Sequence, residues 1–293
     1  MMRSFFSAIS GLTNHQTMMD VVGNNIANVN TTGFKSSRAT FQDVISQTLS
    51  SASAPGATIA GTDPRQVGLG VKLGTIDTIT TQGNLQSTGR PTDLALQGEG
   101  YLVLSDGATT NPVVSYTRDG NLELGVPTSN GDRPLVQSAS GLHIKGWVPP
   151  QAASTADSST APTTDVTIPA TQNGVAVTGF RIDASGIVSL NLADGTTTAN
   201  YAQLAVATFP NTGGLQRMGN NLFGVSGNSG APSYNGANIN GRGQVQTGFL
   251  ETSNVDLATQ FTSMIMAQRG FQANSRVITA ADEILQDLIN LKR

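Results

Sequence analysis

Apolar residues recur at alternating spacings of three and four near both ends of the chain, which is the pattern of an amphipathic helix with a heptad seam. We predict one helix over residues 1–29 and a longer one over 254–293. Ser253 and Asp256 resemble a capping pair at the start of the second helix. The seam positions, which we expect to form an assembly interface, are Phe5, Ile9, Leu12, Met19, Ile26, Leu257, Phe261, Met264, Phe271, Ile278, Leu285 and Ile289.

A different pattern occupies the middle of the chain. Short apolar runs such as Tyr101–Leu104 and Leu204–Phe209 alternate with turn signals such as Asp194-Gly195. We interpret Arg118-Asp119-Gly120 as a hairpin turn with a local charge pair, and a contact with another subunit is the alternative. The chain contains 33 glycines and only 5% aromatic residues, which favours short strands and many turns. The predicted fold class is α+β, mainly β: N- and C-terminal α-helices pair as a coiled-coil layer, with one central Gly-rich all-β domain.

These patterns suggest domain boundaries. Residues 1–29 and 254–293 would form the terminal helical coiled-coil domain, residues 30–70 a connecting segment, and residues 71–253 the central β domain. Within the β domain, residues 148–170 are rich in Ala, Ser, Thr and Pro and lack periodic apolar positions. We therefore expect a small insert or loop there.

The predicted topology has a consequence for the apolar stripes. The chain leaves the helical layer once and returns once, so we expect antiparallel helices with Val29 level with Asn254. This register places Arg3 level with residue 280, near three acidic residues. These are Asp282, Glu283 and Asp287. One helix cannot cover a wide apolar face of another, so other copies of the chain are the expected partners. We also expect the ends of the free monomer to order only on assembly.

The stretch Gly23–Lys35, GNNIANVNTTGFK, is unusually polar for the end of a helix. Asparagine side chains compete for backbone groups and disfavour helix. Gly33 can close the helix in a left-handed turn. We predict a hinge between the helices and the β domain, in which the amides of Asn24, Asn25 and Asn28 bond to neighbouring subunits. The alternative is a frayed terminus with solvated amides.

Four segments of the chain are distinctive enough to compare with a known family. They are Ser10–Arg38 (SGLTNHQTMMDVVGNNIANVNTTGFKSSR), Leu96–Gly107 (LQGEGYLVLSDG), Tyr116–Leu124 (YTRDGNLEL) and Gly241–Ile278 (GRGQVQTGFLETSNVDLATQFTSMIMAQRGFQANSRVI). Together they resemble the flagellar rod and hook protein family, collinearly over nearly the whole chain. Within that family the chain resembles hook subunits most and distal rod subunits second.

The resemblance implies a structural protein of the bacterial flagellum. A hook subunit self-assembles into a hollow curved helical tube, a flexible joint that transmits torque from the rod to the filament. A distal rod subunit instead forms a rigid drive shaft. For a hook subunit, the implied partners are many copies of itself, the distal rod protein, the hook cap, the hook–filament junction proteins and the flagellar type III export apparatus. The implied location is the extracellular hook of the basal body, reached without a cleaved signal peptide.

Composition argues against most other chemistry. The chain has no cysteine, which excludes disulfides and thiol catalysis. The net charge of −3 does not indicate nucleic-acid binding, and no run of about 18 apolar residues predicts membrane insertion. The two histidines, His15 and His143, lie in unrelated elements, and no catalytic motif occurs. We expect no catalytic residue, no cofactor and no metal. A secreted enzyme is the rival class, and would need paired carboxylates in a cleft near Asp119 or Asp183. A soluble adhesin would not need two apolar stripes.

Overall fold

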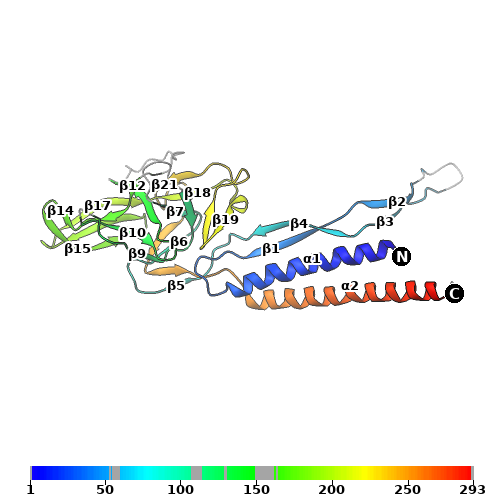
Figure 1. The fold of residues 1–293 in the computed structure, drawn as a ribbon. Coiled ribbons are helices and arrows are strands. Elements are labelled where there is room, and N and C mark those ends of the chain that lie inside the picture. The colour runs from blue at the N-terminus through cyan, green and yellow to red at the C-terminus, as the bar shows by residue number, and fades with distance from the viewer. Residues whose placement is uncertain are drawn as a thin grey trace. The chain divides into compact units, whose positions relative to one another are not determined.

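The computed structural model describes residues 2–52, 54, 60–106, 114–128, 131–148, 162 and 164–291, with the side chains of positions 2, 3 and 288 outside that part. The fold is α+β and mainly β, as predicted, with a helix near each end of the chain (Figure 1). The chain divides into two compact units. Unit 1 holds Met1–Ala27, Ser36–Ile79 and Val255–Arg293, and unit 2 holds Asn28–Lys35 and Thr80–Asn254.

The two long helices of unit 1 lie side by side and antiparallel (Figure 1). Helix α1 spans Met2–Ala27 and helix α2 spans Leu257–Leu291. In three contacting pairs, the residue numbers from the two helices add to 285. The pairs are Gly11 with Asn274, His15 with Gly270, and Asn25 with Gln260. This register lies two residues from the predicted one. The Arg3 side chain is outside the described part, so its approach to the acidic residues stays a prediction.

A β-ribbon belongs to the same unit, and its strands β1 and β4 pack along α1 (Figure 1). Strand β1 (Ser37–Asp43) pairs antiparallel with β4 (Val71–Thr78), and β2 (Ser46–Ser50) pairs with β3 (Arg65–Gly68). Asn14 on α1 donates from Nδ2 to the Val71 carbonyl at 2.8 Å. The ribbon therefore belongs with the helices. This division differs from the predicted one, in which 30–70 is a connector and residue 71 begins the β domain.

Unit 2 contains the remaining strands. The first group is β5 (Leu85–Ser87), β6 (Leu94–Gln97), β7 (Tyr101–Ser105), β8 (Val114–Thr117), β9 (Leu122–Leu124), β10 (Arg133–Gln137), β11 (His143–Trp147), β12 (Thr164–Asp165) and β13 (Thr167–Ile168). The second group is β14 (Thr171–Gln172), β15 (Val175–Ile182), β16 (Ile187–Leu192), β17 (Thr197–Leu204), β18 (Val206–Thr208), β19 (Gln216–Gly219), β20 (Leu222–Gly224), β21 (Ser233–Asn235), β22 (Gln244–Thr247) and β23 (Phe249–Glu251). A short 3₁₀ turn, η1, spans Thr212–Gly214.

Most of these strands join one large antiparallel sheet. Its main path runs β14-β15-β16-β17-β11-β7-β8-β20-β19, and β9, β10, β12, β13, β18 and β21 pair off that path. Two further ladders, β22 with β6 and β23 with β5, tie the chain segment before α2 to earlier strands. Apolar residues alternate along these strands, and their buried side chains pack together to give the unit its own core.

The core of unit 2 has an aliphatic and an aromatic part. The aliphatic part is built from Leu, Ile and Val side chains that are almost fully buried, including Leu104, Leu190 and Leu204. The aromatic part includes Tyr101, Tyr116, Phe209, Phe223 and Tyr234. The hydroxyls of Tyr116 and Tyr234 lie 2.6 Å apart, and burial is the first cause that raises the pKa of Tyr116. Two buried hydroxyls of the aromatic part are thus paired with each other.

The predicted insert at 148–170 contributes in part to this sheet. Strand β12 pairs with β11, strand β13 pairs with β10, and Val166 between them is fully buried. The remainder, 149–161 and 163, lies outside the described residues. Residues 164–168 of the predicted insert are therefore part of the sheet and its core rather than a surface loop.

Helix α2 begins with a side-chain cap on Asp256. Asp256 Oδ1 accepts from the Ala258 N–H at 3.1 Å, and Oδ2 accepts from the Thr259 hydroxyl at 2.5 Å. The Thr259 hydroxyl is the first cause that lowers the pKa of Asp256 below its ordinary value of 3.8, followed by the Ala258 N–H. Asp256 thus accepts side-chain hydrogen bonds that cap the start of this helix.

We expect Asp256→Ala to lower amide protection in the first turn of α2, whereas Asp256→Asn retains most of it because asparagine also caps helices. A carboxyl whose pKa is lowered in the folded state contributes its full stabilisation above pH 3.8. That stabilisation is lost as the pH falls through the lower pKa of the folded state. Hydrogen-exchange protection factors for Ala258 and Thr259 should therefore fall in acid for the native chain and stay level for Asp256→Asn. Equal acid loss in both would contradict the cap.

Candidate functional site: the helix layer and a buried clasp

The face that joins α1 to α2 is made of small and polar residues. We call the pairing in which the two residue numbers add to 285 register 285. It places five positions of each helix level with one another, at alternating spacings of four and three. On α1 they are Gly11, His15, Met18, Val22 and Asn25; on α2 they are Asn274, Gly270, Ala267, Ser263 and Gln260. Ala267 is fully buried and Asn25 is 1% exposed. The seam within one chain therefore needs few large apolar side chains.

The predicted apolar stripe lies one residue beyond this seam. Leu12, Met19 and Ile26 each follow a seam position of α1, and Phe261, Met264 and Phe271 each follow one of α2. One residue is about 100° around a helix, so these side chains point out of the seam. Across the predicted stripe, the exposed residues are Ile9, Leu257, Phe261, Phe271, Leu285 and Ile289, and the half-buried ones are Phe5, Leu12, Met19, Ile26, Met264 and Ile278.

The exposed side of α2 includes apolar residues that the predicted stripe omits. Leu257, Phe261 and Ile265 follow one another at intervals of four, and are 40%, 50% and 57% exposed. Residues four apart lie on one face of a helix, so these three form a continuous apolar surface. Ile265 could have been found from the sequence by extending the i, i+4 spacing from Phe261.

The three asparagines of the predicted hinge behave differently from one another. Asn25 donates from Nδ2 to the Ser37 carbonyl at 2.7 Å and to Gln260 Oε1 at 3.0 Å, and its Oδ1 accepts from the Ser37 N–H at 2.9 Å. Its amide is thus used inside the chain, instead of bonding a neighbouring subunit. Asn24 is exposed, and Asn28 Oδ1 accepts from the Thr31 hydroxyl at 3.1 Å.

The β-ribbon of unit 1 also carries exposed apolar side chains. Strands β2 and β3 are exposed at every position, and no described residue covers their faces. The exposed apolar residues of the ribbon and its turns are Ile45, Leu49, Val67, Leu69, Leu73 and Ile76. A two-stranded ribbon is marginally stable alone, so this part too gains from a covering partner.

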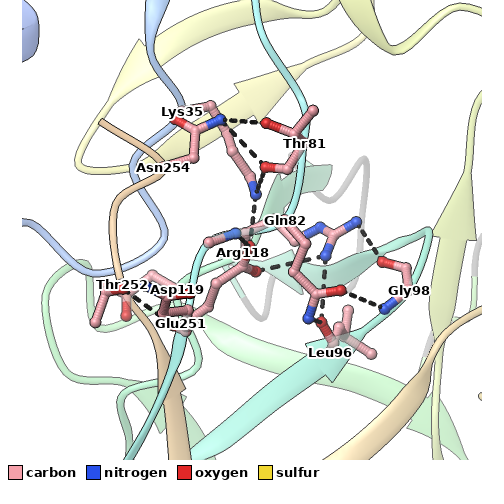
Figure 2. Close-up of polar contacts among 12 residues, drawn as sticks. Lys35, Thr81, Gln82, Leu96, Gly98, Arg118, Asp119, Glu251, Thr252 and Asn254 are labelled. Atoms are coloured by element: carbon pink, nitrogen blue, oxygen red, sulfur yellow. Dashed lines mark hydrogen bonds and ion pairs between the residues drawn. The ribbon is translucent and has the colours of Figure 1, made fainter. Parts of the chain in front are cut away.

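A buried cluster of charges occupies unit 2, around the carboxylate of Glu251 (Figure 2). Lys35 Nζ lies 2.6 Å from Glu251 Oε1, and Arg118 Nη1 lies 3.4 Å from Oε2. The Gly83 N–H also donates to Oε1 at 2.8 Å. The side chains of Glu251 and Lys35 are 0% and 1% exposed. We call Lys35, Arg118 and Glu251 the clasp.

The two cations of the clasp have further acceptors (Figure 2). Lys35 Nζ donates to the Thr81 carbonyl at 2.9 Å, and Arg118 Nη2 donates to the Gly98 carbonyl at 2.8 Å. The guanidinium also lies 5.3 Å from the centre of the Tyr101 ring. Burial is the first cause that lowers the pKa of Lys35, and the Glu251 carboxylate opposes it. The clasp is therefore a buried network in which Lys35 depends on Glu251 to stay charged.

Backbone bonds bring the two chain segments of the clasp together. The Gly33 N–H donates to the Glu251 carbonyl at 2.8 Å, and the Asn254 N–H donates to the Phe34 carbonyl at 3.4 Å. Gly33 has φ of 66°, the left-handed conformation expected from sequence. Within unit 2, residues 28–35, which follow α1, are thus fastened to residues 251–254, which precede α2.

The clasp was not predicted from the sequence. Arg118 pairs with Glu251, 133 residues away, and not with Asp119 as the local interpretation expected. Asp119 instead accepts from the Thr32 hydroxyl at 3.0 Å and from Gln137 Nε2 at 3.3 Å. Because Arg118 and Glu251 are far apart in the sequence, no local pattern indicates that they are in contact.

The described residues offer no arrangement typical of an enzyme. Asp119 is held by hydrogen bonds, and Asp183 Oδ1 closes a turn by accepting the Ser185 and Ile187 N–H groups, both at 2.9 Å. A cavity of about 360 Å³ beside Arg118 has Glu99 as the one carboxylate in its lining. No group of three or more metal-binding side chains occurs in the described part, and no helix there is long and apolar enough to cross a membrane.

Comparison with known proteins points to one family from both ends of the chain. A model described as flagella basal body rod protein matches residues 6–35, and one described as flagellar basal body rod FlgEFG protein C-terminal matches residues 246–291. The chain is 46% identical to the flagellar basal-body rod protein FlgG of Bacillus subtilis over 296 residues, covering 100% of both chains. It is 35% identical to FlgG of Caulobacter vibrioides, covering 99% of this chain and 100% of the relative.

A hook protein also matches, over a longer alignment. The chain is 30% identical to the flagellar hook protein FlgE of Borreliella burgdorferi over 450 positions, covering 100% of both chains. That alignment is over half as long again as the 293 residues of this chain, whereas the rod alignment with the Bacillus subtilis relative spans 296. The hook relative therefore contains substantial segments for which this chain has no counterpart.

We expect Glu251→Gln to lower the free energy of unfolding of unit 2 by about 3 kcal/mol, because it leaves two buried cations without their carboxylate. Urea unfolding followed by the fluorescence of Trp147, the chain's one tryptophan, measures this. Glu123→Gln is the matched control: Glu123 lies 3.8 Å from Arg90 with both side chains about half exposed, so its change should be about 0–1 kcal/mol.

The defect should also depend on pH. In Glu251→Gln the folded pKa of Lys35 falls further below its ordinary 10.5, so the unfolded chain binds this proton more tightly. Stability of the variant should then rise as the pH increases from the folded value towards 10.5. Equal, pH-independent losses for Glu251→Gln and Glu123→Gln would contradict the clasp.

Proposed function

The chain belongs to the flagellar basal body rod and hook protein family, and within it we propose that it is a subunit of the distal rod rather than of the hook. Identity to a distal-rod-type relative, 46% over the full length of both chains, supports this assignment. The absence of a counterpart to the extra segments of the hook relative supports it as well. The sequence favoured a hook subunit, which is now the second candidate. It is supported by the hook relative, which this chain matches over the full length of both chains.

One observation carries the proposal of self-assembly. Helix α2 already has its partner in α1, yet Leu257, Phe261 and Ile265 remain exposed along another face. Aligned apolar side chains on a soluble chain mark a surface that another molecule covers. We propose that other copies of this chain cover it, in a helical assembly in which the heptad seam continues as coiled-coil packing.

The predicted interface residues fit this role. Phe5, Ile9, Leu12, Met19 and Ile26 on α1, with the predicted stripe of α2, would make contacts between copies instead of within one chain. The exposed ribbon would add a second contact of the same kind. Family members are structural proteins that build polymeric parts of the flagellum, and no observation in the described part favours an enzyme.

The remaining partners follow from the proposed place in the rod. Other copies of the chain would be the main partners, and the hook would be the structure that continues it. The hook cap and the hook–filament junction, expected for a hook subunit, would then not contact it directly. Export through the flagellar type III apparatus stays a prediction. In place of the ordering on assembly that was expected from the sequence, we propose that α1 and α2 already pair in the free chain, because their seam is formed within one copy.

We expect the purified chain to polymerise into straight filaments, and Phe261→Ser with Ile265→Ser to prevent this because both remove apolar area from the proposed interface. Negative-stain electron microscopy and sedimentation measure the outcome. Val126→Ser is the control, since Val126 is an exposed apolar residue of unit 2 outside the helices. Trp147 fluorescence should show unit 2 folded in every variant.

Two results would count against the proposal. Curved filaments from the native chain would favour the hook subunit. Normal polymerisation of the Phe261→Ser, Ile265→Ser variant would exclude this face as the interface between copies.

A further inference from the structure

Two glycines, one on each helix of unit 1, each lie under a polar side chain of the other helix. A Cβ atom built on Gly11 would lie 2.4 Å from Asn274 Nδ2, and one built on Gly270 would lie 2.4 Å from His15 Nε2. Both distances are far below van der Waals contact. Neither position therefore accepts any side chain while its partner stays in place.

The two contacts are related to each other by exchange of the helices. On α1 the glycine precedes the polar residue by four positions, and on α2 it does the same: Gly11 precedes His15, and Gly270 precedes Asn274. We call the gap in the helix surface at each glycine a notch. Each of the two antiparallel helices therefore supplies one notch, and one polar side chain that fills the notch of the other helix. The buried His15 Nδ1 has no hydrogen-bond partner among the described residues, and the ring lies against Gly270.

Only one register satisfies both contacts. A slip of one heptad would place His15 level with Val277 in one direction and with Ser263 in the other. Gly11 would then face Ala281 or Ala267 instead of Asn274. Either slip also separates Asn25 from Gln260, whose bond exists in the observed register. The exposed apolar stripes have no comparable feature, since such side chains accept many packings.

We propose that Gly11–Asn274 and Gly270–His15 form a reciprocal notch lock that selects the antiparallel pairing of α1 with α2 in register 285 against slipped registers. The lock rests on the proposed function in one respect: a polymer crowds many such helices together, which makes wrong pairing a hazard. Its physical basis is exclusion, because a wrong partner places a side chain where the notch requires none.

Helix propensity and the lock make opposite predictions for the same substitution. Alanine is a better helix former than glycine, so propensity alone predicts that Gly270→Ala strengthens α2. The lock predicts weaker pairing, because the new methyl group displaces the His15 ring from the seam. Gly23 provides the matched control, since a Cβ atom built there meets nothing within 4 Å. Gly23→Ala should show the effect of propensity alone.

The absence of native cysteine allows a direct test of the pairing. Met18→Cys with Ala267→Cys reports register 285, and Met18→Cys with Gln260→Cys reports a slip of one heptad. Oxidation of the full-length chain, both free and polymerised, yields an intrachain product for self-pairing and a dimer for pairing between copies. Denaturing electrophoresis separates the two.

We expect Gly270→Ala to lower the intrachain yield of the Met18–Ala267 reporter roughly five- to tenfold, with a rise in slipped or interchain products. Adding His15→Ala should restore most of the yield, because it empties the space that the new methyl group needs. Gly23→Ala should leave the yield unchanged or higher. Gly11→Ala, rescued by Asn274→Ala, tests the second notch independently.

Three outcomes would overturn the lock: a native yield in Gly270→Ala, a failure of His15→Ala to rescue it, or no intrachain product from the unsubstituted reporter in either state. Failure of the proposed function gives a different result. In that case no variant polymerises, while the yields of the free chain still follow the pattern expected for the lock.

Discussion

The close approach of α1 and α2 along small and polar residues is the constraint on which the rest of the helix layer depends. Because Gly11, Ala267 and Gly270 occupy the seam, the two helices pair with few large apolar side chains between them. Those side chains are one residue further round each helix and remain on the surface of α2. A chain built this way completes its own helix pair and still presents an apolar face, which is what a subunit of a polymer needs.

In unit 2, the clasp of Lys35, Arg118 and Glu251 is the corresponding constraint. A buried carboxylate with two cations is a costly arrangement, and an apolar core would give comparable stability. Its value lies in specificity: Glu251 has to meet both Lys35 and Arg118, which come from distant parts of the chain. Together with the Gly33–Glu251 backbone bond, it fixes the segment that follows α1 against the segment that precedes α2. Both segments therefore belong to the folded β unit instead of forming a loose connector.

The sequence was sufficient for the two helices, the β middle and the family, because these depend on local periodicity and on contiguous motifs. It failed where long-range geometry decides. The heptad pattern identified large apolar positions as the helix seam, yet the seam uses their neighbours, since polar Asn25 and His15 face inward only because Ser37 and Gly270 lie opposite them. The Lys35–Glu251 pair joins residues 216 apart, and no local pattern indicates such a contact. Residues 30–70 were predicted to be a connector because the partners in their ladder are far apart in sequence, as Ser37 and Thr78 are.

We propose that the seam within a chain and the interface between chains are different faces of the same helices. Hydroxyl-radical footprinting of the free and polymerised chain tests it directly, because it measures the solvent accessibility of individual side chains. We predict strong protection of Phe261, Ile265 and Phe271 on polymerisation, little change at Met18 in the seam, and none at Tyr116 in the core of unit 2. Unchanged reactivity of Phe261 and Ile265 in the polymer would contradict the account.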